Sequence, residues 1–292
     1  MQPTLFVLLY GGGLLFWYGL LSARYTPLTA GAALLGTAFT LMLWEGYFSP
    51  QFIPVLVFVA GLALSLKIVQ QPIWQVVGWT LYILMVLALG FHLFPQLRPV
   101  PLFAATGTDT VPMVWFSPEK VLLMWLVPTM VLVPWASRQR EHRSNSEKPR
   151  MLFVGVLAAT LATLIPLAMA MDYIRPGITA VPLPALLYSL AYNLMFVCIL
   201  EESFFRGILQ NAFIRGFNRI GLRYAAALGI VAAAVLFGLA HFAGGATYVW
   251  LAAVAGIGYG TAYYLTQRLH YAVLIHFIVN AVHQIGFAAP TG

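Results

Sequence analysis

The sequence predicts an all-α protein, a polytopic transmembrane helical bundle of about ten spans. Of its 292 residues, 61% are hydrophobic and only 8% are charged, and the apolar residues come in long runs rather than in amphipathic periods. The net charge of +7 would suggest nucleic-acid binding in a soluble protein. Here the Lys and Arg residues gather in short loops between apolar runs, so we expect the lipid bilayer as a partner and no nucleic acid.

The apolar runs are long enough to cross a hydrocarbon layer of about 30 Å. The first run lacks the positive flank of a signal peptide, so we keep it as a span. The expected spans are 5–23, 27–44, 51–69, 72–94, 121–136, 151–171, 183–214, 224–242, 246–266 and 271–288. The seventh would be a helix of about 48 Å, so its last turns must leave the hydrocarbon layer.

The Lys and Arg residues of the loops predict the orientation. Eleven of them lie in loops on one side of the membrane and three on the other. By the positive-inside rule both termini face outward, and the basic loop 137–150 is cytoplasmic. This loop separates the accessory transmembrane helices of 1–136 from a second part, 151–292. The outer loop 95–120 contains no cluster of residues suited to catalysis.

Two adjacent carboxylates, Glu201 and Glu202, interrupt the seventh apolar run, whereas the other acids lie in loops or near the ends of runs. One charged side chain at the centre of a bilayer costs about 3 kcal/mol, so such a pair indicates a functional site. Arg206 follows Glu202 by four residues, which favours an ion pair on one helix face. Glu201 is turned by about 100° and should face another helix, where it could exchange a proton in acid/base chemistry.

Further polar residues interrupt the later runs. The eighth ends in Phe237-x-x-x-His241, and the tenth contains His276-x-x-x-Asn280 followed by His283. Polar side chains that share a face of a membrane helix point to the bundle interior or to a water-filled cavity. Counted along the runs, His276 lies near the inner face and His241 nearer the outer face, so the membrane side to which a cavity opens is left undecided.

Two other features have structural interpretations. Ala252, Gly256 and Gly260 repeat every four residues in the ninth run, a stripe of small residues that lets helices approach closely. Cys198 is the only cysteine, which excludes an internal disulfide and a multi-cysteine metal site, and we interpret it as a small buried hydrophobic residue.

Three motifs together carry a resemblance to a known family. They are Glu201-Glu202-x-x-x-Arg206, Phe237-x-x-x-His241 and His276-x-x-x-Asn280. In order and spacing they resemble the motifs of the CPBP or Abi family of intramembrane proteases, which includes the Rce1-type CAAX prenyl endopeptidases. The resemblance covers about 183–288, a little over a third of the chain. It implies that 151–292 is a CPBP-like protease core.

The resemblance implies a role for each matching residue. Glu201 and His241 would activate a water molecule for attack on a peptide carbonyl, and His276 and Asn280 would hold the resulting oxyanion. His283 has no counterpart in the motifs, and we expect it to line the cavity.

A metal is an open alternative, because Glu201, Glu202, His241 and His276 could be zinc ligands. However, the sequence has no H-E-x-x-H, and a pair between Glu202 and Arg206 would compete with metal binding. With Glu202 and Arg206 organising the site, we favour a glutamate-type mechanism without a cofactor.

The implied substrate is a membrane-anchored or lipid-modified protein, and the expected location is a bacterial inner membrane. Two alternatives use the same residues differently. In a proton-coupled transporter, Glu201, His241 and His276 would form a relay, but the expected seventh helix is unbroken and no repeat is apparent. In a non-enzymatic immunity or scaffold protein, the polar residues would only hold helices together.

Overall fold

The structure is a computed structural model in which the chain forms two compact units, Met1–His142 and Arg143–Gly292. The predicted all-α fold is confirmed, because helices make up most of the residues that the structure describes and the described strands have only two residues each. The residues that the structure describes are 3–22, 25–47, 50–91, 93–94, 100–101, 115–116, 119–120, 122–123, 127, 148–177 and 182–288.

The described part of the first unit consists mainly of apolar helices. Helix α1 packs along α2, and α3 packs against α4. The elements are α1 (Pro3–Ser22), α2 (Tyr25–Trp44), a 3₁₀ turn (Pro50–Phe52), α3 (Ile53–Ile68), α4 (Pro72–Gly90) and the antiparallel pair β1 (Val100–Pro101) and β2 (Trp115–Phe116). Most of the predicted span 121–136, most of the outer loop 95–120 and residues 137–147 of the basic loop lie outside the described residues.

The second unit contains all the motif residues. Its elements are α6 (Lys148–Ala170), β3 (Arg175–Pro176), α7 (Leu183–Tyr192), a π-helical segment (Asn193–Cys198), α8 (Ile199–Glu202), a second π-helical segment (Ser203–Gln210), α9 (Asn211–Arg219), α10 (Ala225–Leu239), a 3₁₀ turn (Phe242–Gly244), α11 (Gly245–Thr266), α12 (Leu269–Gly286) and β4 (Phe287–Ala288).

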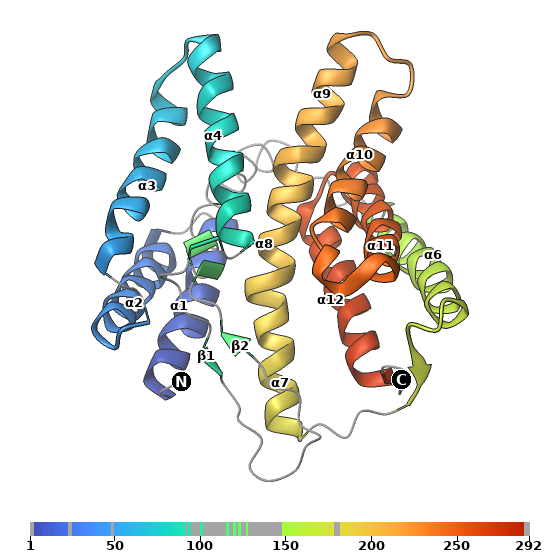
Figure 1. Cartoon of the computed structure of the whole chain (residues 1–292), viewed down its shortest axis with the longest axis horizontal. Helices are drawn as coiled ribbons and strands as arrows, with labels where there is room; N and C mark the ends of the chain where they lie inside the picture. Colours follow the sequence, from blue (N-terminus) through green and yellow to red (C-terminus); the bar gives the residue numbers. More distant parts are fainter. Residues whose placement is uncertain are drawn as a thin grey trace. The chain divides into compact units, whose positions relative to one another are not determined.

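Helices α7, α8 and α9, with the π-helical segments between them, form one long helix (Figure 1, yellow to orange). It has 37 residues, Leu183–Arg219, and so continues beyond the predicted end at 214. The continuation α9 is polar, which fits the expectation that the last turns leave the hydrocarbon layer. The helix is continuous, but the sequence did not predict the two π-helical segments, a form that is rare and often occurs at functional sites.

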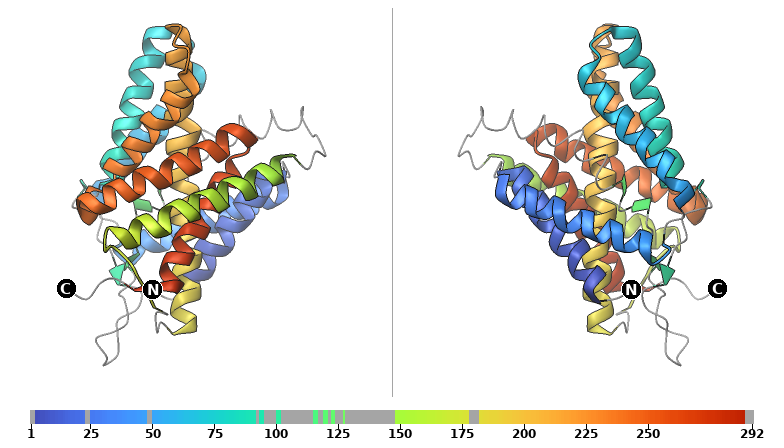
Figure 2. Two further views of the ribbon diagram at one scale, coloured as in Figure 1. Left: turned by 90° about the vertical axis from the view of Figure 1, so that its right-hand side faces the viewer. Right: turned by 90° about the vertical axis from the view of Figure 1, so that its left-hand side faces the viewer.

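Helix α11 is central to the second unit, because it packs against α6, α10 and α12. These helices cross the long helix obliquely (Figure 2). The predicted small-residue stripe allows the close contact with α10: a Cβ atom at Gly256 would lie 3.1 Å from the Cα atom of Ala234. At the end of α12, β4 pairs antiparallel with β3 and ties the end of the bundle to the α6–α7 connection.

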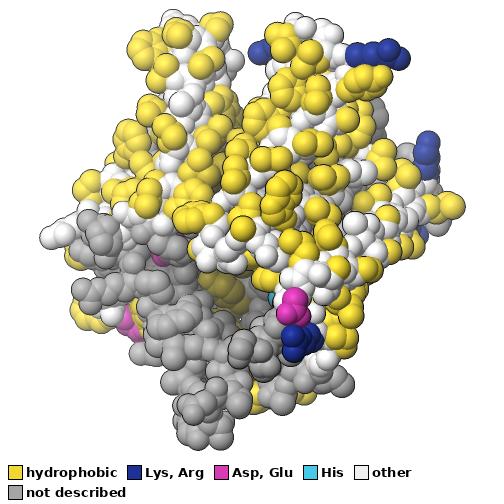
Figure 3. Space-filling view, turned by 45° about the vertical axis from the view of Figure 1, so that its right-hand side comes forward, with side chains coloured by type: hydrophobic (Ala, Val, Ile, Leu, Met, Phe, Trp, Pro, Cys, Tyr) yellow, Lys and Arg dark blue, Asp and Glu magenta, His cyan; other side chains and the backbone are white. Residues whose placement is uncertain are grey.

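The surface and the helix lengths agree with a multi-pass integral membrane protein. Among the described residues, six helices are long and apolar enough to cross a membrane, and three more apolar helices are shorter. Hydrophobic side chains cover most of the described surface in Figure 3, and charged side chains are few. The prediction of a multi-pass integral membrane protein is thereby confirmed, whereas the bacterial inner membrane, the number of ten spans and the orientation stay predictions.

Candidate active site

The two carboxylates lie on α8, between the two π-helical segments, and have different surroundings. The Glu202 side chain is completely buried, whereas 20% of the Glu201 side chain is exposed. Because adjacent residues of a helix point about 100° apart, each carboxylate meets a different set of neighbours. The pair therefore divides into two sites that can be described separately.

Both oxygens of Glu202 have partners. Its Oε2 atom lies 3.0 Å from Nε of Arg206, so the ion pair expected from the four-residue spacing is present. Its Oε1 atom lies 2.9 Å from Nδ1 of His276. An ionised carboxylate can only accept hydrogen bonds, so Nδ1–H of His276 is the donor. These contacts leave Nε2 as the nitrogen of His276 available to a ligand.

Arg206 is held from several sides although only 1% of its side chain is exposed. Its Nη2 donates a hydrogen bond of 3.0 Å to the carbonyl oxygen of Gly256. The guanidinium carbon lies 4.5 Å from the ring centre of Phe237 and 5.3 Å from that of Tyr259, within the range of cation–π attraction. The small-residue stripe on α11 therefore also places a backbone acceptor next to the buried arginine.

Aromatic rings fix the orientation of His276. Its ring stacks on Tyr259 at 4.7 Å with an interplanar angle of 14°, and it meets Phe237 edge to face at 5.6 Å. Glu202, Arg206, His276 and these two rings form what we call the Glu202 cluster. In this cluster each buried charge has an opposite charge nearby, which offsets the large cost of removing it from water.

Glu201 faces His241, which follows α10. Nδ1 of His241 lies 2.7 Å from the carbonyl oxygen of Phe237, and because a carbonyl can only accept, Nδ1 carries the hydrogen. In the neutral ring Nε2 is then an acceptor with a free lone pair. Nε2 lies 3.9 Å from Oε2 of Glu201, too far for a direct hydrogen bond but close enough for one water molecule to contact both atoms.

Asn280 has a partner that the sequence did not indicate. Its Nδ2 donates to Oδ1 of Asn193 at 3.2 Å, and the same oxygen accepts from Sγ of Cys198 at 3.1 Å. Asn193 begins the first π-helical segment. The available signal was an amide residue within the same apolar run as the two carboxylates. Cys198 is fully buried, in agreement with its structural interpretation.

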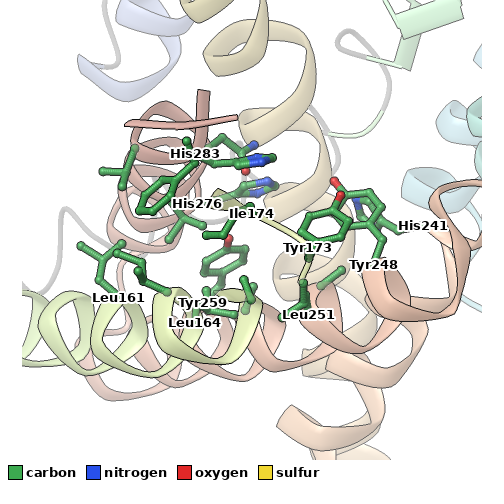
Figure 4. A pocket seen from close by; sticks show the side chains of 18 of the residues that line it. Leu161, Leu164, Tyr173, Ile174, His241, Tyr248, Leu251, Tyr259, His276 and His283 are labelled. Atoms are coloured by element: carbon green, nitrogen blue, oxygen red, sulfur yellow. The ribbon is translucent and has the colours of Figure 1, made fainter. Parts of the chain in front are cut away.

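A cavity of about 100 Å³ joins several of these residues. Its walls are mostly apolar side chains of α6, α11 and α12, and His241, His276, Asn280 and the expected His283 also line it. In Figure 4, Tyr173 and Tyr248 lie beside His241, while His276 and His283 lie on another side of the cavity. Glu201 is not part of the lining, and it reaches the cavity wall through its neighbour His241.

The arrangement corrects the membrane depths counted along the sequence. The sequence placed His276 near the inner face and His241 nearer the outer face, but the two histidines lie beside adjacent carboxylates on α8, at 2.9 Å from Glu202 and 3.9 Å from Glu201. The count was wrong because the helices cross obliquely, so that position along a run does not measure depth (Figure 2).

The side chains considered as zinc ligands do not form one ligand set. Among the described residues no group of three or more His, Cys, Asp and Glu side chains is arranged to hold a metal ion. Glu202 and His276 bond to each other, and Nδ1 of His241 bonds to the backbone. Oε2 of Glu201 and Nε2 of His241 face each other across 3.9 Å, and Nε2 of His276 has no hydrogen bond within the described part of the chain, but these atoms do not form the group of three protein ligands that a catalytic zinc usually has.

The fold and this site define a polytopic membrane protein with an acid–histidine pair beside a mostly apolar cavity. Residues 183–282, about a third of the chain, match the family model described as type II CAAX prenyl endopeptidase Rce1-like. The match spans all three motifs, so the predicted relationship to Rce1-type intramembrane proteases is confirmed for this region. No curated protein and no solved structure matches the chain.

Proposed function

We propose that the protein is an intramembrane endopeptidase in which Glu201 and His241 activate a water molecule. The observation that carries this proposal is the 3.9 Å separation of Oε2 of Glu201 and Nε2 of His241, next to a cavity that His241 lines. The Glu201 oxygen is buried and has no hydrogen-bond partner among the described residues. A water molecule between the two atoms would supply that partner.

In the proposed reaction the water oxygen attacks the carbonyl carbon of a peptide bond placed in the cavity. Glu201 or His241 accepts the proton that the water releases, and a tetrahedral intermediate forms. As the C–N bond breaks, the same proton passes to the leaving amine, so one water molecule is consumed and an acid and an amine are produced.

His276 and Asn280 are proposed to stabilise the oxyanion. Because Nδ1–H of His276 is bonded to Glu202, its ring can donate to an oxyanion only from Nε2, and only when protonated. The amide of Asn280 has two hydrogens: its nitrogen donates to Oδ1 of Asn193 at 3.2 Å and makes a long contact of 3.9 Å with Sγ of Cys198. In the proposed reaction the oxyanion replaces the weak sulfur acceptor, while the bond to Asn193 keeps the amide in place.

The proposed substrates are membrane-anchored or lipid-modified proteins. The matched family is described as acting on prenylated CAAX proteins, and the cavity walls of leucine, isoleucine, valine and alanine suit an apolar segment.

The test compares host membranes that contain wild type, Glu201→Gln or His241→Ala at matched expression. We expect a precursor to accumulate in both variants, seen by mass spectrometry of protein termini. Glu45→Gln and His270→Ala are matched controls, since neither residue lines the cavity, and they should process the precursor normally. Unchanged termini in both site variants, with proton flux into vesicles abolished, would instead establish the transporter, and unchanged termini with unchanged flux the scaffold protein.

The glutamate-type mechanism has a separate test. Purified protein is stripped of metal with a chelator and then assayed on the precursor found above. Full activity after stripping supports the proposed mechanism, because Glu201 and His241 need no metal to activate water. Activity that is lost on stripping and restored by zinc would overturn it.

A further inference from the structure

The turn between His241 and α11 contains two consecutive glycines, Gly244 and Gly245, that the three motifs do not include. The turn is a 3₁₀ segment, Phe242–Gly244, and α11 begins at Gly245. A turn can require glycine for two reasons: its φ is positive, or a Cβ atom would clash with a neighbouring residue. Gly244 and Gly245 are required for different reasons.

Gly245 is required for its backbone conformation, whereas Gly244 is required because a side chain there would clash with a neighbour. Gly245 has φ = 86°, a conformation that side chains disfavour, and a Cβ atom there would meet nothing within 4 Å. Gly244 has φ = −84°, which any residue adopts. A Cβ atom at Gly244 would lie 2.2 Å from Cδ1 of Tyr248. The missing side chain therefore makes room for the Tyr248 ring.

The Tyr248 ring occupies this space against His241. It meets the imidazole edge to face, with ring centres 5.1 Å apart and an interplanar angle of 83°. Tyr173, from the α6–β3 connection, stacks on Tyr248 at 5.7 Å with an angle of 9°. The ring centre of Phe237 lies 4.7 Å from that of His241. Figure 4 shows Tyr173, Tyr248 and His241 together at one side of the cavity.

The aromatic contacts restrict rotation of the His241 ring, which its hydrogen bond alone does not prevent. Among the described residues His241 makes one hydrogen bond, from Nδ1 to the Phe237 carbonyl, and a single hydrogen bond restrains rotation about the side-chain dihedrals only weakly. Turning would move Nε2 away from Oε2 of Glu201, which it faces across 3.9 Å. The edge-to-face contact with Tyr248 opposes this rotation.

We propose that Tyr248 is a positioning residue whose ring, admitted by Gly244, holds the His241 imidazole with Nε2 facing Glu201. The proposal rests on the proposed function, in which this pair activates water. In this proposal the aromatic ring of Tyr248 orients His241, and the hydroxyl group is not needed. A substitution of Gly244 then affects the reaction only by displacing the Tyr248 ring. Both statements can be tested by substitution.

The experiment measures the rate at which full-length enzyme in host membranes processes the precursor that accumulates with Glu201→Gln. Tyr248→Phe keeps the ring and should stay within about twofold of wild type. Tyr248→Ala should lower the rate at least about tenfold, since small misplacements of reacting groups are costly. Gly244→Ala should lower it similarly, because the new methyl group displaces the ring. The double variant Gly244→Ala/Tyr248→Ala should be no slower than Tyr248→Ala.

Matched controls separate positioning from loss of fold. Tyr264→Ala removes a more exposed tyrosine of the same helix, and Gly155→Ala adds a methyl group where nothing lies within 4 Å. Both should process the precursor at the wild-type rate. In Tyr248→Ala the rate per folded enzyme should fall while the amount of folded enzyme extracted from the membranes stays that of wild type. A general loss of folded enzyme would lower the extracted amount and the rate together.

Failure of the inference differs from failure of the proposed function. If Glu201→Gln accumulates no precursor, the proposed function fails and the role of Tyr248 fails with it. If the precursor accumulates but Tyr248→Ala processes it at the wild-type rate, only the positioning role is overturned. Additive losses in the double variant, or a Tyr248→Phe rate as low as that of Tyr248→Ala, would also overturn it.

Discussion

Glu201 and Glu202 are neighbours on α8, yet Glu202 has partners at both oxygens while Glu201 faces a histidine across a gap of 3.9 Å. The Glu202 cluster is fully buried and joins the long helix to α11 and α12. The Glu201–His241 pair is partly exposed, and its histidine borders the cavity. The two regions are one residue apart in the sequence and differ in what lies beside the carboxylate: an arginine and a histidine nitrogen at 3.0 and 2.9 Å for Glu202, and a histidine at 3.9 Å for Glu201.

This difference shows how a helix in a membrane protein can contain two adjacent acidic residues. Bonds to Arg206 and His276 compensate Glu202, so its charge supports the packing of three helices. The same bonds leave Glu202 little capacity for a substrate. Glu201 keeps its capacity because Arg206 lies on the other face. The following predictions test this division, starting with the largest expected effect.

Arg206→Met should lower the free energy of unfolding by about 3–5 kcal/mol, because the buried Glu202 carboxylate loses the positive charge that compensates it. The measurement is a denaturant titration of purified protein in detergent. Arg175→Met is the matched control, since Arg175 pairs with Asp172 at the surface and should cost about 1 kcal/mol or less. Glu202→Gln/Arg206→Met should recover part of the loss. Equal losses for the two arginines would contradict the role of the cluster.

Gly256→Ala should lower the free energy of unfolding by about 1–3 kcal/mol, because its Cβ atom would lie 3.2 Å from Nη2 of Arg206 and 3.1 Å from the backbone of Ala234. The same denaturant titration measures it. Gly155→Ala, which adds a methyl group in open space, should cause no loss. A harmless Gly256→Ala would show that α11 need not approach the arginine so closely.

Asn193→Ala should slow precursor processing about tenfold, because Asn280 loses the acceptor that orients its amide. Its cost in unfolding free energy should be about 1 kcal/mol. Asn211→Ala is the matched control: it removes an asparagine bonded to Tyr263 and Gly207, so it should cost similar stability at an unchanged rate. If the two variants slow the reaction equally, Asn193 has no special role in the site.

Tyr173→Phe should have the smallest effect, and only in alkaline solution. Burial raises the pKa of the Tyr173 phenol above its ordinary value of 10.0. Above pH 10 the folded protein therefore keeps a proton that the unfolded chain loses, so the unfolding free energy falls as pH rises. That fall should be smaller in Tyr173→Phe, measured by denaturant titration at pH 9 to 11. An unchanged slope would show that the aromatic side of the cavity is open to water.

Local spacing was enough to predict much of the site. The contact between Glu202 and Arg206 joins residues four apart, so the helix period alone predicts it. The long apolar runs predicted the helical membrane bundle, and His283 lines the cavity as expected. The roles assigned to the motif residues in catalysis stay predictions.

The contacts that the sequence could not predict depend on how helices pack. His276 reaches Glu202 across 74 residues, and Asn280 reaches Asn193 across 87. No helical periodicity relates residues so far apart in the sequence. The way in which α12 crosses the long helix decides which of their residues meet. Tyr248 was missed for a different reason. Its contact with His241 depends on a turn that a single glycine opens, and the sequence shows the glycine without its neighbour.

The π-helical segments before and after α8 give the long helix a rotational phase that a uniform α-helix of the same length would not have. A π-helical turn bonds residue i to i+5, so each such turn takes up one residue more than an α-helical turn. Asn193 can thus face Asn280 while Glu202 faces His276, both on α12. Removing one residue between these two positions would rotate one contact about 100° from the other. The spacing from Asn193 to Glu202 is therefore as restrictive as the identity of either residue, and a chain with one residue fewer there could keep every motif and lose the site.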